Sequence, residues 1–541
     1  MNVRLLFAFV LAAPAVAHSF ASTPELGEIR FPSSGAPQAQ EAFIRAVLLL
    51  HSFEYDDARE SFQEVQAIDP GFALAYWGEA MTHNHPLWRE QDRDAALQAL
   101  AKLAPTPAAR AAKAPAGRER GYLRAVETLY GEGTKPDRDL AYSEAMGDLA
   151  ARFPEDLEAR VFYSLSILGT AQGVRDFSIY MRAGAVAEEV FAANPRHPGA
   201  AHYLIHSYDD PVHAPLGLRA ARVYAQIAPA ASHAQHMISH IYVALGYWTE
   251  SVDANVRSFQ VSVERRDRKS LEIDELNYHS LHWLMYSYLQ LGRFDDARAM
   301  LEKMTGYAGE SGSPRALWYH AALRAAWIVE TGGRPAPAEI RPDDTQVTGA
   351  AADLFANGYA ALLAGKHEEA VAAANRIGAR HDRAAAGHLC GQSGGYSDTS
   401  KTDLIVAKVL QQSLRALIET ERGNTDEALA LFVEATAAEE AMPLDFGPPI
   451  IVKPSHELYG EVLLRLDRPA EAQVQFEKAL QRAPRRSLAL AGLARAARAT
   501  SDAATVAKAC GELASSYSGA DASVPRPAPC AAAAIAGGRT P

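Results

Sequence analysis

The sequence is poor in cysteine, with three in 541 residues, at positions 390, 510 and 530. Three thiols cannot build a disulfide scaffold or a four-cysteine zinc or iron–sulfur site. In an oxidising compartment Cys510 and Cys530 could pair and leave Cys390 free. Any metal site in this chain therefore needs other ligands.

Positive charge is scarce as well. The 53 Lys and Arg residues are outnumbered by 65 Asp and Glu residues, which gives a formal net charge of −12, and no long basic run occurs. This balance argues against nucleic acid or an anionic membrane as the main partner. Apolar residues make up 48% of the chain and charged residues 22%, which is typical of a globular protein rather than a disordered one.

No apolar run reaches the roughly 20 residues that a membrane-spanning helix needs. The N-terminal run, residues 5–17, is preceded by Arg4 and followed by small residues that offer cleavage sites after Ala17 and after Ala21. This pattern predicts a secretory signal peptide over residues 1–21, with the cleavage site left open; a buried first helix is the alternative. We therefore expect a periplasmic or secreted protein without a membrane span.

Common catalytic motifs are also missing from the sequence. There is no Gly-x-Ser-x-Gly elbow, no phosphate-binding loop and no His-Glu-x-x-His helix. His202 and His206 have the histidine spacing of the last motif but lack its glutamate. A conventional zinc protease is therefore not expected.

Strand-like alternation is nearly absent, and a helix–turn–helix pattern recurs instead. Four segments each contain a helix end, a Gly-type turn and the start of an Ala-rich second helix: LGYWTESVDANVRSF (245–259), LGRFDDARAML (291–301), AGKHEEAVAAA (364–374) and RGNTDEALALF (422–432). Near the two ends of the array, small, aromatic and proline residues recur in the same order: Ala58, Phe62 and Pro70, then Ala472, Phe476 and Pro484. This pattern resembles the tetratricopeptide repeat family.

The resemblance implies an all-α superhelical solenoid of about ten helix pairs over residues 38–500. One array then replaces the three or four domains that the length alone would predict. The repeat pattern is weaker at residues 106–154 and 314–345. Residues 515–541 are rich in Ala, Pro and Gly, so we expect a disordered tail there.

Histidine is concentrated in one part of the chain. Eight of the 18 histidines lie within residues 202–282, which is about 15% of the sequence. Apart from His213, they form three sets at helical spacing: His202 and His206; His233, His236 and His240; and His279 and His282. Residues three, four or seven apart share one face of a helix, so each set presents its imidazoles together.

The tetratricopeptide resemblance implies where these faces point. Tyr208, Tyr242 and Tyr288 take the aromatic position of the repeat, which places all seven histidines on the first helices of three consecutive repeats, within residues 198–305. In this family such positions line the concave groove, and Asp209 and Tyr286 continue the same surface. Neighbouring helix axes lie about 8–10 Å apart, so the imidazoles are expected to converge.

Converging imidazoles favour a transition-metal site. Three or four nitrogens suit one ion and six or seven suit two; an all-imidazole set favours copper, with iron or zinc possible. Asp209, Asp210 or His213 could hold an imidazole N–H, and Tyr286 could contact a substrate. The alternatives are polar groove residues that bind a peptide carboxylate, and histidines satisfied by neighbouring side chains.

The leading hypothesis is a metal-dependent oxidoreductase that uses copper or iron with dioxygen or a peroxide. Its substrate is a small molecule or peptide in the concave groove, and metal-assisted hydrolysis is a variant. The alternatives are a non-catalytic scaffold that binds a peptide or protein, and a metal-storage or delivery protein. A second metal site could involve Glu79, His83 and His85, or His456, Glu457 and Glu461, although such groups are also found as helix-end caps or solvated faces.

Overall fold

The structure is a computed structural model of the chain. It describes residues 21–23, 25–115, 117–171, 175–338, 340–341, 345–389, 400–444, 446–526 and 528–530. Apart from Ala21, the predicted signal peptide lies outside the described residues, as does Cys390.

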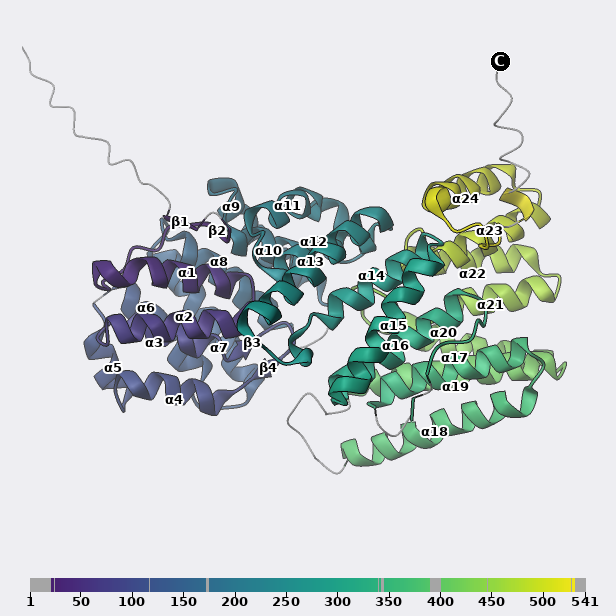
Figure 1. The fold of residues 1–541 in the computed structure, drawn as a ribbon, viewed down its shortest axis with the longest axis horizontal. Coiled ribbons are helices and arrows are strands. Elements are labelled where there is room, and N and C mark those ends of the chain that lie inside the picture. The colour runs from purple at the N-terminus through teal and green to yellow at the C-terminus, as the bar shows by residue number, and fades with distance from the viewer. Residues whose placement is uncertain are drawn as a thin grey trace, which may run out of the picture.

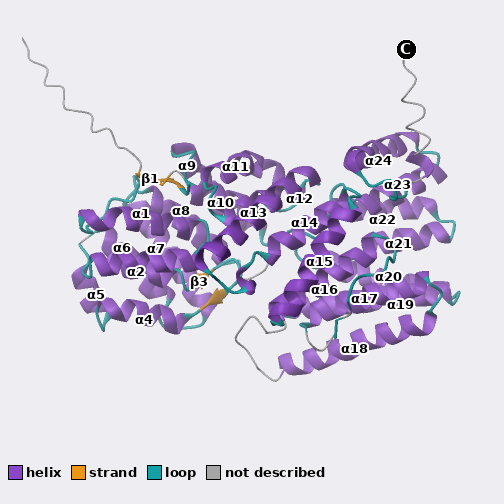
Figure 2. Cartoon of the chain, viewed as in Figure 1, coloured by secondary structure: helices purple, strands orange, loops and turns teal. Residues whose placement is uncertain are grey.

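The described chain folds into consecutive antiparallel helices, with two very short β-ribbons (Figure 2). The first half contains β1 (Ala21–Thr23), β2 (Gly27–Ile29), α1 (Gln40–His51), α2 (Tyr55–Ile68), α3 (Ala73–Met81), β3 (Asn84–His85), β4 (Glu90–Gln91), α4 (Arg93–Leu103), α5 (Pro107–Lys113), α6 (Arg118–Leu129), α7 (Lys135–Arg152), α8 (Leu157–Gly169), α9 (Phe177–Ala193), α10 (Pro198–Tyr208), α11 (Ala214–Ile227), α12 (Ser232–Ala244) and α13 (Trp248–Lys269). The second half contains α14 (Tyr278–Gln290), α15 (Phe294–Ser311), α16 (Pro314–Glu330), α17 (Val347–Leu363), α18 (His367–Leu389), α19 (Lys401–Glu421), α20 (Thr425–Glu440), α21 (Ser455–Arg465), α22 (Pro469–Arg482), α23 (Ser487–Ala499) and α24 (Ala503–Ser516).

The predicted all-α solenoid of about ten tetratricopeptide-like helix pairs is confirmed. The small residues of the repeat pattern lie where two helices approach closely, as two glycines illustrate. A Cβ on Gly78 would lie 2.1 Å from the Phe62 ring, and a Cβ on Gly492 would lie 2.2 Å from the Phe476 ring. The pattern is weak where the pairing is irregular, at the short α5 and at α16, which has no second helix of its own.

The solenoid has two halves that meet at the histidine-rich repeats (Figure 1). One hydrophobic core extends from Leu26 to Ala254 and the other from Val243 to Val524. The C-terminal repeats contact the middle of the chain, where the Trp248 indole donates to the Arg485 carbonyl at 3.2 Å. Helices α12 to α14 therefore lie where both cores join.

The C-terminal segment differs from the disordered tail that its composition predicts. Residues 517–519 form a 3₁₀ helix, and the backbone N–H of Asp521 donates to the Gly292 carbonyl at 3.0 Å. Tyr517 is buried, and a disulfide joins Cys510 to Cys530. Packing and the cross-link thus order a sequence that is rich in Ala and Pro, while residues 531–541 lie outside the described part.

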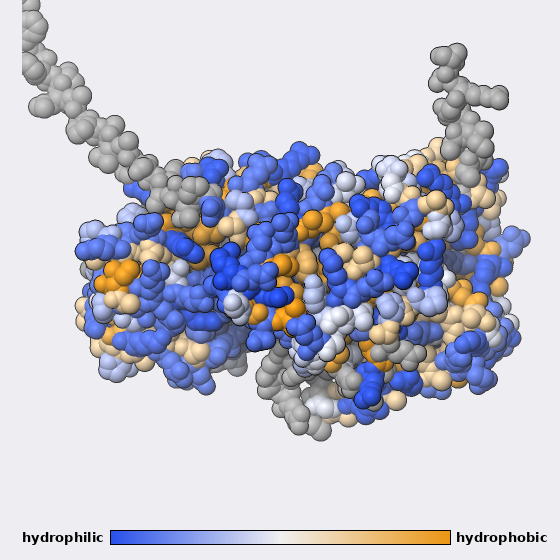
Figure 3. Space-filling model, viewed as in Figure 1, coloured by the Kyte–Doolittle hydropathy of each residue, from blue (hydrophilic) through white to orange (hydrophobic). Residues whose placement is uncertain are grey.

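The visible face of the molecule is mostly hydrophilic, with apolar residues in small patches (Figure 3). Within the described residues, none of the helices combines the length and apolarity that crossing a lipid bilayer requires.

Candidate metal centre

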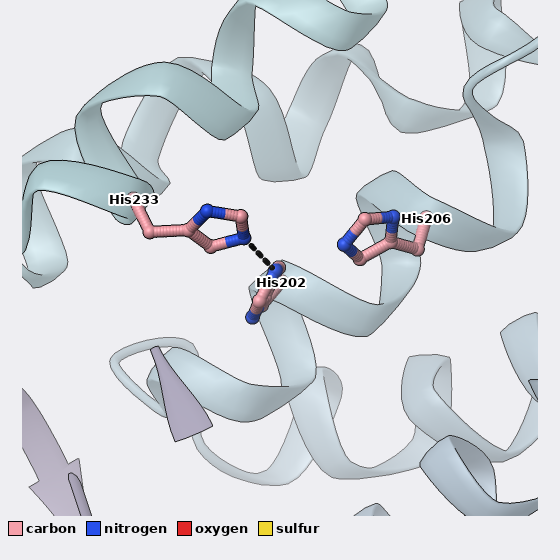
Figure 4. A group of neighbouring side chains, drawn as sticks. All are labelled: His202, His206 and His233. Carbon is pink, nitrogen blue, oxygen red and sulfur yellow. Dashed lines mark hydrogen bonds between the residues drawn. The ribbon is translucent and has the colours of Figure 1, made fainter. Parts of the chain in front are cut away.

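Six of the seven histidines form two groups of three. In each group the nearest ring nitrogens all lie within 4.8 Å of one another. The first triad is His202 and His206 from α10 with His233 from α12, and Figure 4 shows these three rings around a common space. The second triad is His236 and His240 from α12 with His279 from α14. Three neighbouring helices therefore supply both triads.

A hydrogen-bonded joint aligns the helices that carry the second triad. The Asn277 side chain caps α14 by accepting from the Ser280 N–H, and its amide donates to Ser232 Oγ, at the start of α12, at 3.2 Å. Ser232 Oγ also donates to the Ser258 carbonyl on α13. This joint fixes the relative height of α12 and α14, so that the His236 and His279 rings meet with centroids 4.5 Å apart.

The second triad has its ring protons fixed on the outer nitrogens. His236 Nδ1 donates to Asn255 Oδ1 at 2.7 Å, and His240 Nδ1 donates to Asp209 Oδ2 at 3.0 Å. Asn255 uses its amide to donate to the Ser251 carbonyl, so its oxygen is the acceptor. The Nε2 atoms of His236 and His240 then both carry lone pairs, and they face each other at 3.1 Å. Two facing lone pairs repel unless a proton or a metal ion lies between them.

The first triad shows this arrangement only in part, because His233 and His202 can form an ordinary N–H···N hydrogen bond. His202 Nδ1 donates to the His51 carbonyl at 2.7 Å, which leaves its Nε2 as an acceptor 3.2 Å from His233 Nε2. His206 Nε2 is buried and has no hydrogen-bond partner, which is costly for a polar atom. His206 Nδ1 lies 3.5 Å from Asp209 Oδ2. Outer nitrogens held by oxygen and inner nitrogens left open are the usual arrangement around a protein-bound metal.

Burial lowers the pKa of five of these imidazoles, those of His202, His206, His233, His236 and His279, and so favours the neutral form that binds metals. It lowers the pKa of His206 to about 4 and the pKa of His202 and His236 well below the ordinary value. His233 and His279 are only partly buried, so each triad retains a route to solvent.

Asp209 joins the two triads. Its Oδ2 lies near the Nδ1 atoms of both His206 and His240, whose ring centroids are 5.6 Å apart. Burial alone would raise its pKa, but Arg175 and the two histidines hold the pKa of Asp209 well below the usual range. Because its oxygens are bound to Arg175 and to ring N–H groups, Asp209 orients ligands. It could alternatively enter a third ligand group with the same two histidines.

Asp210 and His213 do not hold a triad imidazole directly, in contrast to the prediction from the sequence. Asp210 pairs with Arg175 at 3.0 Å and accepts from His213 Nδ1 at 2.9 Å, and within the described part of the chain it makes no hydrogen bond to a triad ring. His213 thus supports the Asp210–Arg175 pair rather than an imidazole of a triad.

Aromatic side chains cover both triads. The Phe53 ring lies 4.3 Å from the His202 ring, and Trp88, at the tip of the β3–β4 hairpin, lies 5.8 Å from the His233 ring. Phe53 has a left-handed backbone with φ of 56°, which is unusual for a bulky residue and marks local strain. On the other side, Trp283 and Phe446 stack on His240 with centroids 4.5 and 4.9 Å away. Sequence reasoning missed Phe53, Trp88 and Phe446 because they come from distant segments.

Two of the predicted residues lie outside the triads. His282 is on α14 with His279 but faces Trp318 and Tyr319, with ring centroids 6.2 and 6.1 Å away. The Tyr286 hydroxyl accepts from Arg486 at 2.9 Å. Neither completes a metal-ligating group in the described part of the chain.

The first suggested second site is a polar network rather than a convergent ligand set. Glu79 accepts from Gln63, Gln66 and Lys102 at 2.6–2.8 Å, which holds the pKa of this carboxyl below its usual value against the effect of burial. His85 stacks on Tyr55 with centroids 4.0 Å apart, and no metal-ligating group of described residues includes it or His83.

The other suggested site consists of ion pairs. Lys453 donates to Glu457 at 2.8 Å and to Glu461 at 2.9 Å, and Arg486 donates to Glu457 at 2.7 Å. His456 Nδ1 instead donates to Gln475 Oε1 at 2.7 Å. The carboxylates that could have bound a metal are neutralised by Lys453, which lies just before α21, and by Arg486, at the start of α23.

A further buried group was not predicted: His51, Glu158 and His197, here called the Glu158 cluster. His51 Nε2 donates to Glu158 at 2.7 Å and His197 Nε2 donates to it at 3.0 Å. Tyr203 lies 3.0 Å from His51 Nδ1 and donates to it, and His197 Nδ1 accepts from the Ala200 N–H. Every ring nitrogen has a partner, so this cluster is a completed hydrogen-bond network.

Comparisons with known proteins give no functional assignment. No protein-family profile matches the chain, and no curated protein matches it. Similar solved structures include a human IFIT1 dimer with m7Gppp-AAAA (12% identity, TM-score 0.34, covering 90% of this chain and 87% of that one), a Rap protein complexed with competence and sporulation factor (11%, 0.36, 74% and 98%) and yeast Tom70 (13%, 0.26, 88% and 91%). These similarities identify no ligand or reaction for this chain.

Proposed function

We propose that this chain is a periplasmic or secreted metalloprotein whose two histidine triads hold two transition-metal ions. The observation that carries this proposal is the second triad, in which the Nε2 lone pairs of His236 and His240 face each other at 3.1 Å while both Nδ1 protons are committed elsewhere. A metal ion turns that repulsion into coordination.

Copper is the favoured metal. Each triad offers only imidazole nitrogens, and the nearest carboxylate, Asp209, is occupied by Arg175 and His240. Imidazole-only sites suit copper, whereas iron sites usually include a free carboxylate; zinc and iron remain outcomes of the test. The triads adjoin, with the His206 and His240 rings 5.6 Å apart, so the two ions would act as a pair.

The activity that fits such a pair is oxidation or reduction with dioxygen or a peroxide. Bound copper would supply the electron transfer. The chain itself fixes ring orientation through Asp209, Asn255 and the His51 carbonyl, and limits water through Phe53 and Trp283. The predicted signal peptide and the Cys510–Cys530 disulfide support an oxidising location, where copper proteins with few thiols are stable.

The test is metal analysis of purified protein, loaded in turn with copper, iron and zinc and then dialysed. We expect two copper ions per chain in the native protein. His279→Ala should lose the ion of the second triad, while His282→Ala, one helical turn away on α14, should retain both. This pair is matched because both changes remove a partly buried imidazole from the same helix.

Two results would overturn the proposal. One is a native chain that retains no metal above background after all three loadings, which would leave the non-catalytic peptide-binding scaffold. The other is equal metal content in the His279→Ala and His282→Ala proteins. Retention of copper without any oxidase or peroxidase turnover would separate a storage protein from an enzyme.

A further inference from the structure

A cavity lies beside the second triad, between the concave side of α12 and α14 and the proline-rich loop that joins α20 to α21. About 80 Å³ of it is open to the centre of a water molecule, several times what one water needs. Its walls include Val243 and Ala244 from α12, Trp248 from α13, Tyr286 from α14 and the loop residues Phe446 and Ile450.

Phe446 separates this cavity from the metal ligands. Its ring forms part of the cavity wall and also stacks on His240 with centroids 4.9 Å apart. The side chain is 39% exposed, which is unusual for a phenylalanine beside a cavity. The next residue, Gly447, is pressed against Trp283, where an added Cβ would lie 2.2 Å from the indole. One aromatic ring thus stands between the cavity and His240.

The walls favour a flat, aromatic guest. Trp248 and Tyr286 meet edge to face, with centroids 5.7 Å apart and planes at 80°, and Phe446 supplies a third ring. A planar ring can pack against such a corner by stacking or edge contact, which an aliphatic ring of the same size cannot do equally well. Pro211, Pro448 and Pro449 add further rigid apolar surface.

The charged groups of the lining are hydrogen-bonded to neutral groups of the protein. Glu439 accepts from the Ser455 N–H at 2.7 Å, and Arg482 donates to the Met442 and Pro443 carbonyls. His456 Nδ1 donates to Gln475. The lining holds one carboxylate, Glu439, and one guanidinium, Arg482, so a charged guest of either sign would meet a like charge and lose its hydration. The cavity therefore favours an uncharged guest.

From these contacts we infer that this cavity binds a small uncharged aromatic molecule beside the second triad, with the Phe446 ring between the two. The binding itself needs no metal. That the guest is the substrate of the metal pair rests on the proposed function.

Binding can be measured by calorimetric titration of metal-free protein with 4-methylphenol, 4-methylcyclohexanol and 4-methylbenzoate. The first two differ in aromaticity and the third adds a charge. We expect 4-methylphenol to bind at least tenfold more tightly than the other two. Ala244→Phe, which fills the cavity from α12, should weaken that binding at least tenfold and leave the metal content unchanged.

A second variant tests the same cavity in case the first variant fails to fold. Ile450→Ser puts a hydroxyl into the cavity wall and should weaken 4-methylphenol binding, whereas Ile405→Ser, at an exposed position on α19, should not. Equal affinity for the three probes, or unchanged affinity in both cavity variants, overturns the inference. Aromatic binding to a protein that takes up no metal would uphold the cavity and reject the metal centre; metal without aromatic binding would do the reverse.

Discussion

The Glu158 cluster and the second triad are both made of buried histidines, and they differ in one respect. In the Glu158 cluster each inner nitrogen, His51 Nε2 and His197 Nε2, donates to a carboxylate placed between them. In the second triad the inner nitrogens of His236 and His240 meet only each other. Histidine content and burial are therefore poor guides to a metal site; what matters is whether the inner nitrogens already have a partner.

The two kinds of cluster are also connected. His51 belongs to the Glu158 cluster through its ring, and its backbone carbonyl accepts from His202 Nδ1 of the first triad. The completed network thus acts as a rigid support for His202, one of the proposed metal ligands. This division of roles predicts that disrupting the Glu158 cluster reduces stability, while disrupting the triads reduces metal binding.

The largest effect is expected from Glu158→Ala. It leaves two buried imidazole N–H groups without an acceptor and should lower the unfolding free energy of metal-free protein by about 3–5 kcal/mol. His236→Ala should cost metal-free protein no more than about 2 kcal/mol, because truncation also removes one of the two facing lone pairs. Urea unfolding followed by circular dichroism measures both. Equal losses in the two variants would contradict the contrast drawn between the clusters.

The next effect is the acid sensitivity of the Glu158 cluster. Burial opposes ionisation, but His197 and His51 hold the pKa of Glu158 at about 2, below the value near 4.5 of an unfolded chain. Because the pKa is lower in the folded state, the ionised carboxylate stabilises the protein above about pH 4.5. This stabilisation is lost as the pH falls towards 2. The full contribution is about 3 kcal/mol, with about 2 kcal/mol gone by pH 3.

The measurement compares native protein with Glu158→Gln in urea between pH 6 and pH 3. The difference in unfolding free energy between them should shrink by about 2 kcal/mol over this range. A difference that does not change with pH would mean that Glu158 is not held ionised by its histidines.

Metal addition tests the same contrast through the triads, which are expected to bind the ions. Free copper at about one hundred times its dissociation constant raises the unfolding free energy by about 2.7 kcal/mol per site. Native protein and Glu158→Gln should gain similarly, and His279→Ala should gain from one site only. Thermal unfolding with and without a chelator measures these gains; a gain that disappears in Glu158→Gln but persists in His279→Ala would reverse the two assignments.

The sequence was sufficient for the array and for the convergence of six histidines, because both depend on local rules. The repeat pattern fixes which helix faces inward, and spacings of three and four residues fix which imidazoles share that face. The same rules could not show that His282 faces Trp318, since the direction of a ring depends on its neighbours. The suggested ligand pair Glu457 and Glu461 failed for a related reason: Lys453, just before α21, turns back onto both carboxylates, and Arg486 reaches Glu457 from the next repeat.

The Glu158 cluster and the aromatic covers were beyond sequence reasoning for a different reason. Glu158 bonds to His51 across 107 residues and to His197 across 39, and His202 bonds to the His51 carbonyl across 151. Phe446 approaches His240 from a loop more than two hundred positions away. Such contacts follow from superhelical closure, which no periodicity within one repeat encodes.

The smallest effects should come from the hydrogen bonds just outside each cluster, and they separate the two roles most cleanly. Asn255→Ala removes the acceptor that fixes His236 Nδ1–H, so the proton can move to Nε2 and the second ion should bind about tenfold more weakly, with little change in metal-free stability.

Tyr203→Phe is the matched change at the Glu158 cluster. It removes the hydroxyl that donates to His51 Nδ1 and should cost about 1 kcal/mol of stability, while both copper affinities remain as in native protein. Competition titration against a copper chelator and urea unfolding, applied to both variants, give the two readouts. If Tyr203→Phe weakened copper binding as much as Asn255→Ala does, the Glu158 cluster would have to be counted as part of the metal centre, to which the His51 carbonyl connects it through His202.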